Sequence, residues 1–487
     1  MRIENVVSHF LENIPIIRNK DGEVIASSQF LSEYKSLKSY CLSDFRDDSI
    51  VAIQLDKDYK YLISILVCME IGLTYVPLHI DFPDERVNQI KHISNFKGII
   101  NNDVFDRILK ESYTIKNKIN SFSLNIKKVL YMMFTSGSTG EPKGVEIKRE
   151  SYQNFLTWLD GFFNINEDDI ILNTTEFTFD VSLVDIGLLL VKHASIVFSN
   201  FQNNIFKFLL ELENFKITTI ATVPNNFSMI LTDDLINKVD LSNLKYSLIA
   251  GSKFSYNLYE NLKKYLPSLR IYNCYGPTEF TIYCFVKELG IESDISKSTV
   301  SIGRPILNTK FKIVDDDLNC VKSGVEGELL VSGLQLMQGY KNNHNETSKA
   351  IVKIDNADYY RTGDIAFFDQ RNNSYIVGRK DDTVKISGFR VNLSDVDAYI
   401  HKLTYIQDSY TIVVDGINRS SYLVSYVALN DKMPSSVIIK DLKAILPSFQ
   451  MPKYIEIIRD FPLNTSGKIC TKTLQMKFKD KYSAPTN

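Results

Sequence analysis

The stretch Thr135-Ser-Gly-Ser-Thr-Gly-Glu-Pro-Lys-Gly144 directly follows an apolar run, Val129–Phe134, that predicts a buried strand. Its glycines allow the backbone to turn tightly and to approach a ligand closely. Its hydroxyl groups can donate hydrogen bonds, Lys143 adds a positive charge, and successive N–H groups in such a turn form an anion-binding nest. We therefore predict a phosphate-binding loop.

This loop differs from the P-loop of kinases and GTPases, which requires G-x-x-x-x-G-K-[ST]. Pro142 precedes Lys143 and Gly144 follows it, so a P-loop kinase is excluded. The alternative is a surface loop of small residues. Ten specified residues directly after a strand argue against it.

On both sides of this loop, apolar β-branched runs alternate with helical patterns. Alternation of this kind predicts an α/β fold with layered sheets covered on both faces. After about Ser301, short strands with Gly- and Asp-rich turns predict a β-rich subdomain. The expected strands are Ser49–Gln54, Gly98–Asn101, Ile170–Asn173, Ile196–Ser199, Thr218–Val223, Thr309–Val314 and Gly327–Ser332; the expected helices are Asp58–Ile71, Arg149–Phe163 and Ile205–Phe215.

A second change of pattern comes near Gly378–Asp382. Beyond it the sequence predicts a small α+β domain of about a hundred residues, joined by the segment GRKDD. We therefore expect a large N-terminal domain of residues 1–379 and a small C-terminal domain of residues 380–487. The expected elements of the small domain are the helices Ser394–Leu403 and Ser436–Leu446 and the strands Ser409–Val414 and Tyr422–Leu429.

The composition and net charge of the chain limit the classes of protein to which it can belong. The chain has 487 residues, 44% of them apolar, and a formal net charge of −2, which gives no global case for a nucleic-acid or membrane partner. Its six cysteines form no C-x-x-C pair or zinc spacing. The amphipathic start lacks the features of a signal peptide, and the most apolar stretch, Tyr61–Leu78, falls short of a membrane span. A reducing, cytoplasmic location is expected.

Further segments are rich in residues that could bind a nucleotide. Taken alone, each of these segments could be a surface turn. The lysine of the last one, Lys468, could be a solvated charge. They are, in order, Gly251-Ser252, Asn273-Cys-Tyr-Gly-Pro-Thr-Glu279, Tyr360-Arg-Thr-Gly-Asp364, Gly378-Arg-Lys-Asp381 with Val384-Lys-Ile-Ser-Gly-Phe-Arg390, and Pro462-Leu-Asn-Thr-Ser-Gly-Lys468.

Together with the phosphate loop, these segments resemble the signature motifs of adenylate-forming enzymes, both in their residues and in their order along the chain. That superfamily includes acyl-CoA synthetases, luciferases and the adenylation domains of non-ribosomal peptide synthetases. The resemblance extends from about residue 50 to 475. It implies an ATP-dependent, AMP-forming ligase with a large core domain and a mobile lid domain that carries Lys468.

The resemblance also implies roles in nucleotide binding. The aromatic Tyr275 would stack on adenine, Thr278 would touch the α-phosphate, Glu279 would hold Mg²⁺ and Asp364 would bind the ribose hydroxyls. Lys468 would bridge the substrate carboxylate and the α-phosphate. The nucleotide-binding set is Thr135, Ser136, Gly137, Ser138, Thr139, Gly140, Lys143, Gly251, Ser252, Asn273, Tyr275, Gly276, Asp364 and Arg379.

A second half-reaction is implied by the segment after Gly378. Asp381 stands where relatives pivot the small domain, and Gly388 lies in the turn that lines the tunnel for a thiol arm. The sequence departs from relatives at Asn392, where most carry Glu, and at Cys470-Thr471, where Asp-Arg is usual. These departures predict looser docking of the small domain.

Asp180, in Phe177-Thr-Phe-Asp-Val-Ser182, separates the branches of the superfamily. In members that activate amino acids, an Asp at this place pairs with the substrate ammonium; the alternative interpretation is a helix N-cap. The rest of the implied pocket is uncharged, which predicts an apolar or small side chain. Its lining would be Val181, Val184, Thr222, Leu248, Ala250, Cys274, Ile282 and Tyr283.

The expected activity is therefore adenylation of an amino acid, followed by transfer to the phosphopantetheine thiol of a carrier protein. The chain shows no L-G-G-x-S carrier segment after Lys468, so the carrier is expected to act in trans. Three alternatives stay open: a D-alanine–carrier protein ligase, although Ala250 and Ser252 replace the usual Cys and Glu; an acyl-CoA synthetase; and a non-catalytic scaffold, against which the retained site residues argue.

Overall fold

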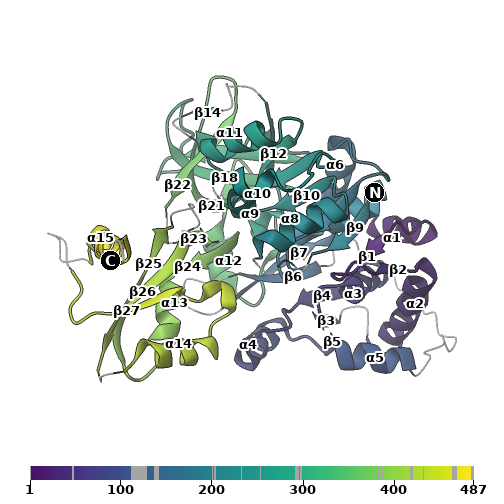
Figure 1. Cartoon of the computed structure of the whole chain (residues 1–487), viewed down its shortest axis with the longest axis horizontal. Helices are drawn as coiled ribbons and strands as arrows, with labels where there is room; N and C mark the ends of the chain where they lie inside the picture. The colour runs from purple at the N-terminus through teal and green to yellow at the C-terminus, as the bar shows by residue number, and fades with distance from the viewer. Residues whose placement is uncertain are drawn as a thin grey trace. The chain divides into compact units, whose positions relative to one another are not determined.

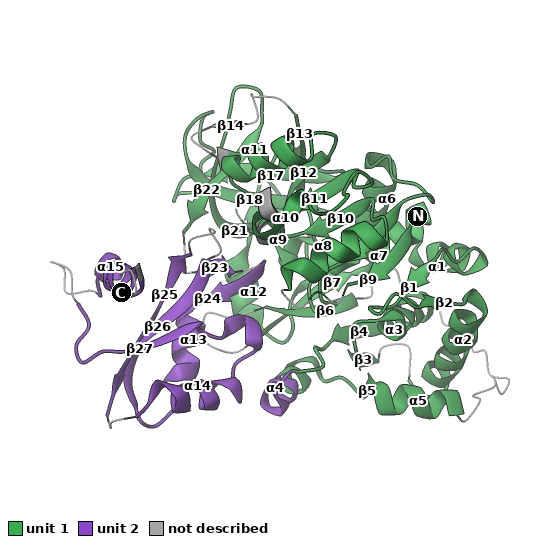
Figure 2. Cartoon of the chain, in the orientation of Figure 1, with its two compact units in different colours: residues 1–81, 90–135, 143–380 green, residues 82–89, 136–142, 381–487 purple. Residues whose placement is uncertain are grey.

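The computed structural model describes residues 2–483 apart from several short gaps. The residues left out are 1, 46–48, 111–128, 136–141, 200, 202–203, 232, 253, 291–294, 297–298, 381–382, 387, 417–420, 431–432, 463–468 and 484–487. The described chain forms two compact units (Figure 2). The first covers residues 1–81, 90–135 and 143–380; the second contains the described residues after Lys380, together with residues 82–89 and Pro142. The predicted α/β class with layered sheets is confirmed.

One sheet of the first unit has six strands. Strands β3, β4 and β5 run parallel to one another, and β6 runs parallel to β4 and antiparallel to β7. The strands in spatial order are β19 (Gly339–Tyr340), β7 (Lys143–Lys148), β6 (Val129–Thr135), β4 (Thr74–Pro77), β3 (Ile50–Gln54) and β5 (Gly98–Asn101). The predicted phosphate loop therefore connects two paired strands, β6 and β7, of this sheet.

A second sheet of the first unit has nine strands (Figure 1). Its five central strands, β12-β11-β10-β8-β9, are parallel, so their carboxyl ends lie at one edge. In spatial order the sheet contains β16 (Arg304–Pro305), β13 (Phe285–Leu289), β12 (Arg270–Tyr275), β11 (Tyr246–Ile249), β10 (Thr219–Thr222), β8 (Ile170–Asn173), β9 (Ser195–Phe198), β1 (Ile17–Arg18) and β2 (Val24–Ile25).

Side chains that alternate along these central strands belong to two different cores. Ile171, for example, lies in one core and its neighbour Leu172 in the other, as expected for a sheet buried on both faces. The first core includes α3 (Tyr59–Ile71), α6 (Arg149–Phe162) and α7 (Ser182–Lys192), together with residues of the six-stranded sheet. The second includes α8 (Ile205–Asn214), α9 (Pro224–Ile230) and α11 (Tyr256–Tyr265).

Helix α3 shows why the sequence folds as predicted here. The carboxylate of Asp58 accepts hydrogen bonds from the N–H groups of Lys60 and Tyr61, which caps the helix N-terminus. The helix ends at Gly72, whose φ of 80° is left-handed. The remaining helices of the chain before residue 240 are α1 (Ile3–Glu12), α2 (Ser27–Asp44), α4 (Asp84–Ser94), α5 (Asn102–Lys110) and α10 (Asp233–Ile236). Within the described residues, no helix meets the length and hydropathy needed to span a membrane.

The expected β-rich region follows residue 300. A five-stranded antiparallel sheet is centred on the long strand β21, which pairs with β18, β20 and β22. Its strands are β17 (Thr309–Val314), β18 (Gly327–Gly333), β20 (Ile351–Ile354), β21 (Ala357–Phe368) and β22 (Ser374–Arg379); the short hairpin β14 (Ile295–Ser296) and β15 (Thr299–Val300) and the helix α12 (His344–Ala350) lie outside it.

The second unit has its own hydrophobic core and an α+β composition. It contains the hairpin β23 (Thr383–Ile386) and β24 (Phe389–Asn392), the sheet β25 (Ile406–Asp415), β26 (Ser421–Leu429) and β27 (Tyr454–Ile457), and the helices α13 (Leu393–Ile400), α14 (Ser435–Lys443) and α15 (Thr471–Ser483). The mobility and lid role of a domain spanning 380–487 stay predictions.

Candidate active site

Many of the predicted site residues gather at the carboxyl edge of the parallel strands. Thr222 ends β10 and pairs in register with Ile249 of β11, which pairs with Asn273 of β12. Ala250 and Gly251 follow directly, and Gly251 has a φ of 87° that favours glycine. Ligands of open α/β sheets bind outside the carboxyl ends of strands. This edge is therefore the candidate binding edge of the first unit.

A buried polar cluster forms where β12 meets the antiparallel sheet. The hydroxyl of Tyr275 donates to Asp364 Oδ2 at 2.5 Å, and Arg379 Nη1 lies 2.7 Å from Asp364 Oδ1. Burial, and then the charge of Asp364, hold the pKa of Tyr275 well above its usual range, so the phenol stays protonated and donates. Three residues from three separate sequence segments are thus brought together. The stacking of Tyr275 on adenine and the ribose role of Asp364 stay predictions.

The turn after Tyr275 is tightly constrained. A Cβ at Gly276 would lie 2.1 Å from the carbonyl oxygen of Ile282, so only glycine fits without backbone movement. Thr281 and Ile282 have φ values of 53° and 73°. The buried side chain of Gln335 donates to the carbonyls of Thr281 and Tyr283 at 3.1 and 2.9 Å, which holds this strained turn in place.

A second polar cluster joins Glu279 to the phosphate-loop lysine. Glu279, 1% exposed in the short helix η1 (Thr278–Phe280), accepts a hydrogen bond of 2.9 Å from the hydroxyl of Tyr340. Lys143 Nζ lies 5.3 Å from the centre of the Tyr340 ring and 2.5 Å from Glu346 Oε2. The hydrogen bond from Lys143 lowers the pKa of Glu346. Sequence reasoning missed Gln335, Tyr340 and Glu346, because no local signal marks contacts over such separations.

Asp180 lies two residues before α7, whose N-cap position is occupied by Val181. Val181 forms no side-chain cap, and Asp180 contributes its carbonyl to the first turn through Leu183 N at 2.9 Å. Burial and the nearby charge of Asp180 raise the pKa of Tyr131, and Asp180 contributes to the raised pKa of Tyr283. Asp180 therefore lies in an aromatic environment.

The predicted pocket lining is largely buried. Thr222, Leu248, Ala250, Cys274, Ile282 and Tyr283 are each less than 5% exposed, Val184 is fully buried on α7, and Val181 packs against the same core. Burial raises the pKa of the Cys274 thiol, so it is a neutral side chain at physiological pH.

Several predicted site residues lie outside the described residues: Ser136, Gly137, Ser138, Thr139, Gly140, Asp381 and Lys468. Thr135 and Lys143, which flank the loop, pair with each other as the last and first residues of β6 and β7. Ser252 follows Gly251 and is partly exposed. In the second unit, Gly388 lies next to the β23–β24 hairpin strands with a φ of 89°.

The residues present fit a magnesium ion that is held by one carboxylate together with substrate phosphates. Among the described residues, no cluster of three or more His, Cys, Asp and Glu side chains forms a complete metal site. Mg²⁺, however, is commonly bound by one or two carboxylates together with substrate phosphates. The buried Glu279 carboxylate, oriented by Tyr340, is compatible with that mode.

Comparison with known proteins identifies the family. Residues 41–341 match the profile of the family described as AMP-binding enzyme. The chain belongs to this family. It is an adenylate-forming enzyme, and the resemblance of its motifs to that superfamily is confirmed.

Relatives of this AMP-binding enzyme include two bacterial proteins. It is 26% identical to a D-alanine–D-alanyl carrier protein ligase of Bacillus licheniformis, over 85% of this chain and 86% of the relative. It is 28% identical to tyrocidine synthase 1 of Brevibacillus parabrevis over 88% of this chain, but it spans only 40% of that longer protein.

Solved structures support the fold. The Vibrio cholerae adenylation domain AlmE, in complex with glycyl-adenosine-5'-phosphate, matches with a TM-score of 0.84 at 21% identity, over 98% of this chain and 97% of that one. An artificially fused adenylation–PCP di-domain from Klebsiella oxytoca matches with a TM-score of 0.81 at 18% identity, over 93% and 86%. At these identities the likeness establishes the α/β adenylation-domain fold alone.

Proposed function

We propose that this enzyme activates an amino acid with ATP and transfers the aminoacyl group to the phosphopantetheine thiol of a separate carrier protein. The observation that carries the proposal is Asp180, a carboxylate just before α7 whose charge acts on the buried Tyr283 of the predicted pocket. A carboxylate at this place offers the opposite charge to a substrate ammonium, and a fatty or aryl acid has no group that would use it.

In the proposed first step, an oxygen of the amino-acid carboxylate forms a bond to the α-phosphorus of ATP. The bond from that phosphorus to the bridging oxygen breaks, and pyrophosphate leaves with the electron pair. Little proton transfer is needed, so catalysis depends on orientation and charge neutralisation. Lys468 and Thr278 would contact the reacting phosphate. Glu279 would hold Mg²⁺, which supplies positive charge to the phosphates when bound.

Asp364 and Tyr275 would fix the nucleoside in this step. Asp364 has a carboxylate oriented by Tyr275 and Arg379, and a carboxylate can accept hydrogen bonds from two ribose hydroxyls. In the second step, the carrier thiolate attacks the carbonyl carbon, a thioester forms and AMP leaves. Rotation about Asp381, with the thiol arm passing Gly388, would separate the two steps.

The substrate side chain is proposed to be small or apolar, since no charged group lies among the predicted lining residues. D-Alanine is the second candidate, favoured by the similarity to a D-alanine–D-alanyl carrier protein ligase over most of both chains.

The proposal is tested by ATP–pyrophosphate exchange across the proteinogenic amino acids, D-alanine, and a set of fatty and aryl acids. Exchange with one or a few amino acids supports it, and exchange only with the other acids would support an acyl-CoA synthetase. A phosphopantetheinylated carrier and CoA are then offered separately as acceptors. Thioester formation on CoA alone would contradict the carrier as partner.

A further inference from the structure

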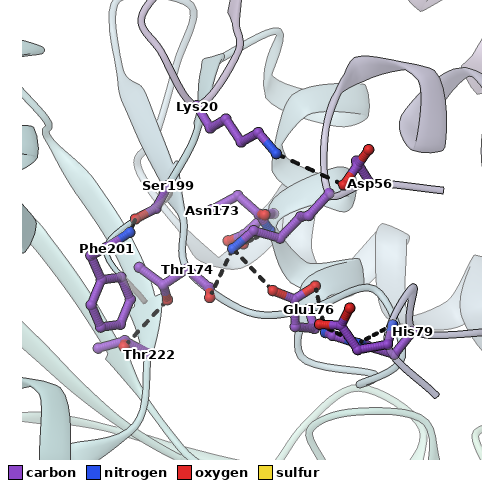
Figure 3. Close-up of polar contacts among 12 residues, drawn as sticks. Lys20, Asp56, His79, Asn173, Thr174, Glu176, Ser199, Phe201 and Thr222 are labelled. Carbon is purple, nitrogen blue, oxygen red and sulfur yellow. Dashed lines mark hydrogen bonds and ion pairs between the residues drawn. The ribbon is translucent and has the colours of Figure 1, made fainter. Parts of the chain in front are cut away.

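The segment that connects β8 to α7, residues 174–181, is anchored by residues that follow strands β3 and β4 of the six-stranded sheet. Lys57, just before α3, donates from Nζ to the carbonyl oxygen of Thr174 at 3.2 Å and lies 3.6 Å from Glu176 Oε1. His79 Nε2, after β4, lies 3.8 Å from Glu176 Oε2. Figure 3 shows Glu176 beside His79, and Thr174 directed toward Thr222 of the predicted pocket, which it contacts at 3.4 Å. The six-stranded sheet therefore anchors a segment that ends at Asp180.

An aromatic contact adds to these polar contacts. The ring of Phe177 packs against Tyr61 of α3 with 4.6 Å between centroids, and against Phe198 of β9 with 6.0 Å. Phe177 is 2% exposed. The segment thus has a polar anchor at Glu176 and an apolar anchor at the next residue.

The anchored position is transmitted to Asp180 through consecutive turns. The N–H of Phe179 donates to the carbonyl of Glu176 at 3.0 Å, and the N–H of Ser182 donates to the carbonyl of Phe179 at 3.1 Å. The Ser182 hydroxyl donates to the same carbonyl at 2.6 Å. Because each turn is hydrogen-bonded to the next, a displacement of Glu176 would displace the backbone of Asp180.

Lys57 is suited to this anchoring role by its charge environment. Its side chain is 12% exposed, and carboxylates face it from three elements: Glu176 in the segment, Asp185 on α7 and Glu211 on α8. Burial lowers the pKa of Lys57, and the charge of Glu176 is the largest effect that opposes this shift. Removal of the Lys57 charge would leave Glu176 without this ion-pair partner and the Thr174 carbonyl without this donor, so the segment would lose part of its anchor.

We propose that Lys57 and Glu176 are positioning residues, which set the location of Asp180 and thereby the recognition of the substrate ammonium. The inference rests on the proposed function. A purely structural role would lower stability and affect all substrates alike. A positioning role acts on the amino group, so it changes the preference for an amino acid over the same acid without its amino group.

The test compares the parent with Lys57→Met, in pyrophosphate exchange with the best amino acid of the panel and with its des-amino analogue. The ratio of the two kcat/KM values is expected to fall about 10-fold to 100-fold, since small misplacements of positioning groups cost this much. The KM for ATP is expected to stay within about twofold of the parent. Lys57→Arg, which keeps the charge, is expected to recover part of the ratio.

Lys20→Met is the matched control. Lys20 lies near the same region in Figure 3 and pairs with Asp56 at 3.9 Å, but none of its ion-pair contacts involves residues 174–181. Its ratio is expected to equal that of the parent. Glu176→Gln, at a side chain that is 36% exposed, provides a second variant if Lys57→Met does not fold.

The outcomes separate the two proposals. If the parent exchanges with an amino acid but the folded Lys57 or Glu176 variants keep the parent ratio, the positioning role is wrong and the proposed function stands. A fall in both kcat/KM values by the same factor would also contradict positioning. If the parent exchanges with no amino acid, the proposed function fails and the inference fails with it.

Discussion

The phenolic hydroxyl of Tyr275 donates a 2.5 Å hydrogen bond to the carboxylate of Asp364, 89 residues further along the chain. The same carboxylate receives Arg379 at 2.7 Å. Strand β12 of the nine-stranded sheet and strands β21 and β22 of the antiparallel sheet are therefore joined at one buried charge. This is the place where the resemblance of motifs implies the ribose of a nucleotide.

Tyr275→Phe removes the donor and leaves a buried carboxylate oxygen with one partner fewer. We expect a loss of about 1–3 kcal/mol in the free energy of unfolding. The measurement is chemical denaturation without nucleotide.

Tyr283→Phe is the matched control, because within the described residues the Tyr283 hydroxyl is buried without a hydrogen-bond partner. Its removal is expected to leave stability unchanged or slightly higher. Equal losses in the two variants would count against the Tyr275–Asp364 contact.

Glu279→Gln preserves the shape of the side chain and an acceptor for Tyr340, but it removes the charge. We expect the exchange rate to fall about 10²–10³-fold, comparable to the loss of a major group that stabilises the transition state. The Mg²⁺ concentration for half-maximal exchange should rise. An unchanged magnesium dependence would contradict the assignment of Glu279 to the metal.

Asp185, fully buried on α7, accepts a hydrogen bond from Asn173 at 2.8 Å. Burial raises its pKa to about 8, so the folded state holds a proton that the unfolded state releases above about pH 4. Stability contributed by this proton is present at low pH and is lost as the pH rises toward 8. The expected slope is at most about 1.4 kcal/mol per pH unit.

Asp185→Asn keeps an acceptor for Asn173 and removes the titration. Thermal unfolding midpoints of parent and variant between pH 5 and pH 8 test this, in buffers whose own pKa changes little with temperature. The gap between the two proteins is expected to shift in favour of the variant as the pH rises. A constant gap would show that Asp185 does not titrate in this range.

Asp381→Pro is expected to spare exchange and to slow transfer to the carrier, because a hinge absorbs backbone change at a few residues and proline fixes φ. Single-turnover transfer from preformed adenylate isolates the second step. Loss of both steps to the same extent would argue against a hinge at this position.

The sequence predicted much of the fold because its strands are buried on both faces and therefore appear as apolar runs. The run Thr218–Val223 contains β10 (Thr219–Thr222), and the helical pattern Arg149–Phe163 differs by one residue from α6 (Arg149–Phe162). In the second unit, the two helices and two strands predicted with bounds are present with ends shifted by up to three residues, as at α14, but the C-terminal helix α15 (Thr471–Ser483) was not predicted.

The polar contacts of the site could not be predicted in the same way. Lys143 meets Glu346 over 203 residues, and Asn154 meets Gln335 over 181, so neither contact has a local period or motif. Lys57 could be identified only as a charge before a helix. Its anchoring of the segment before α7 depends on how two sheets pack, which residue spacing does not encode.

The prediction for Lys468→Ala rests on the resemblance of motifs alone, because Lys468 lies outside the described residues. The variant is expected to keep the parent's unfolding midpoint and to lose about 10²–10³-fold in exchange rate. Exchange equal to the parent would show that another group contacts the α-phosphate.

The most direct test of amino-acid activation is pyrophosphate exchange by the parent and by Asp180→Ala, with the preferred amino acid and with its des-amino analogue. We predict that the parent strongly prefers the amino acid and that Asp180→Ala loses most of this preference while its KM for ATP is retained. Equal exchange by the parent with both acids, or an unchanged preference in Asp180→Ala, would contradict recognition of an ammonium group at Asp180.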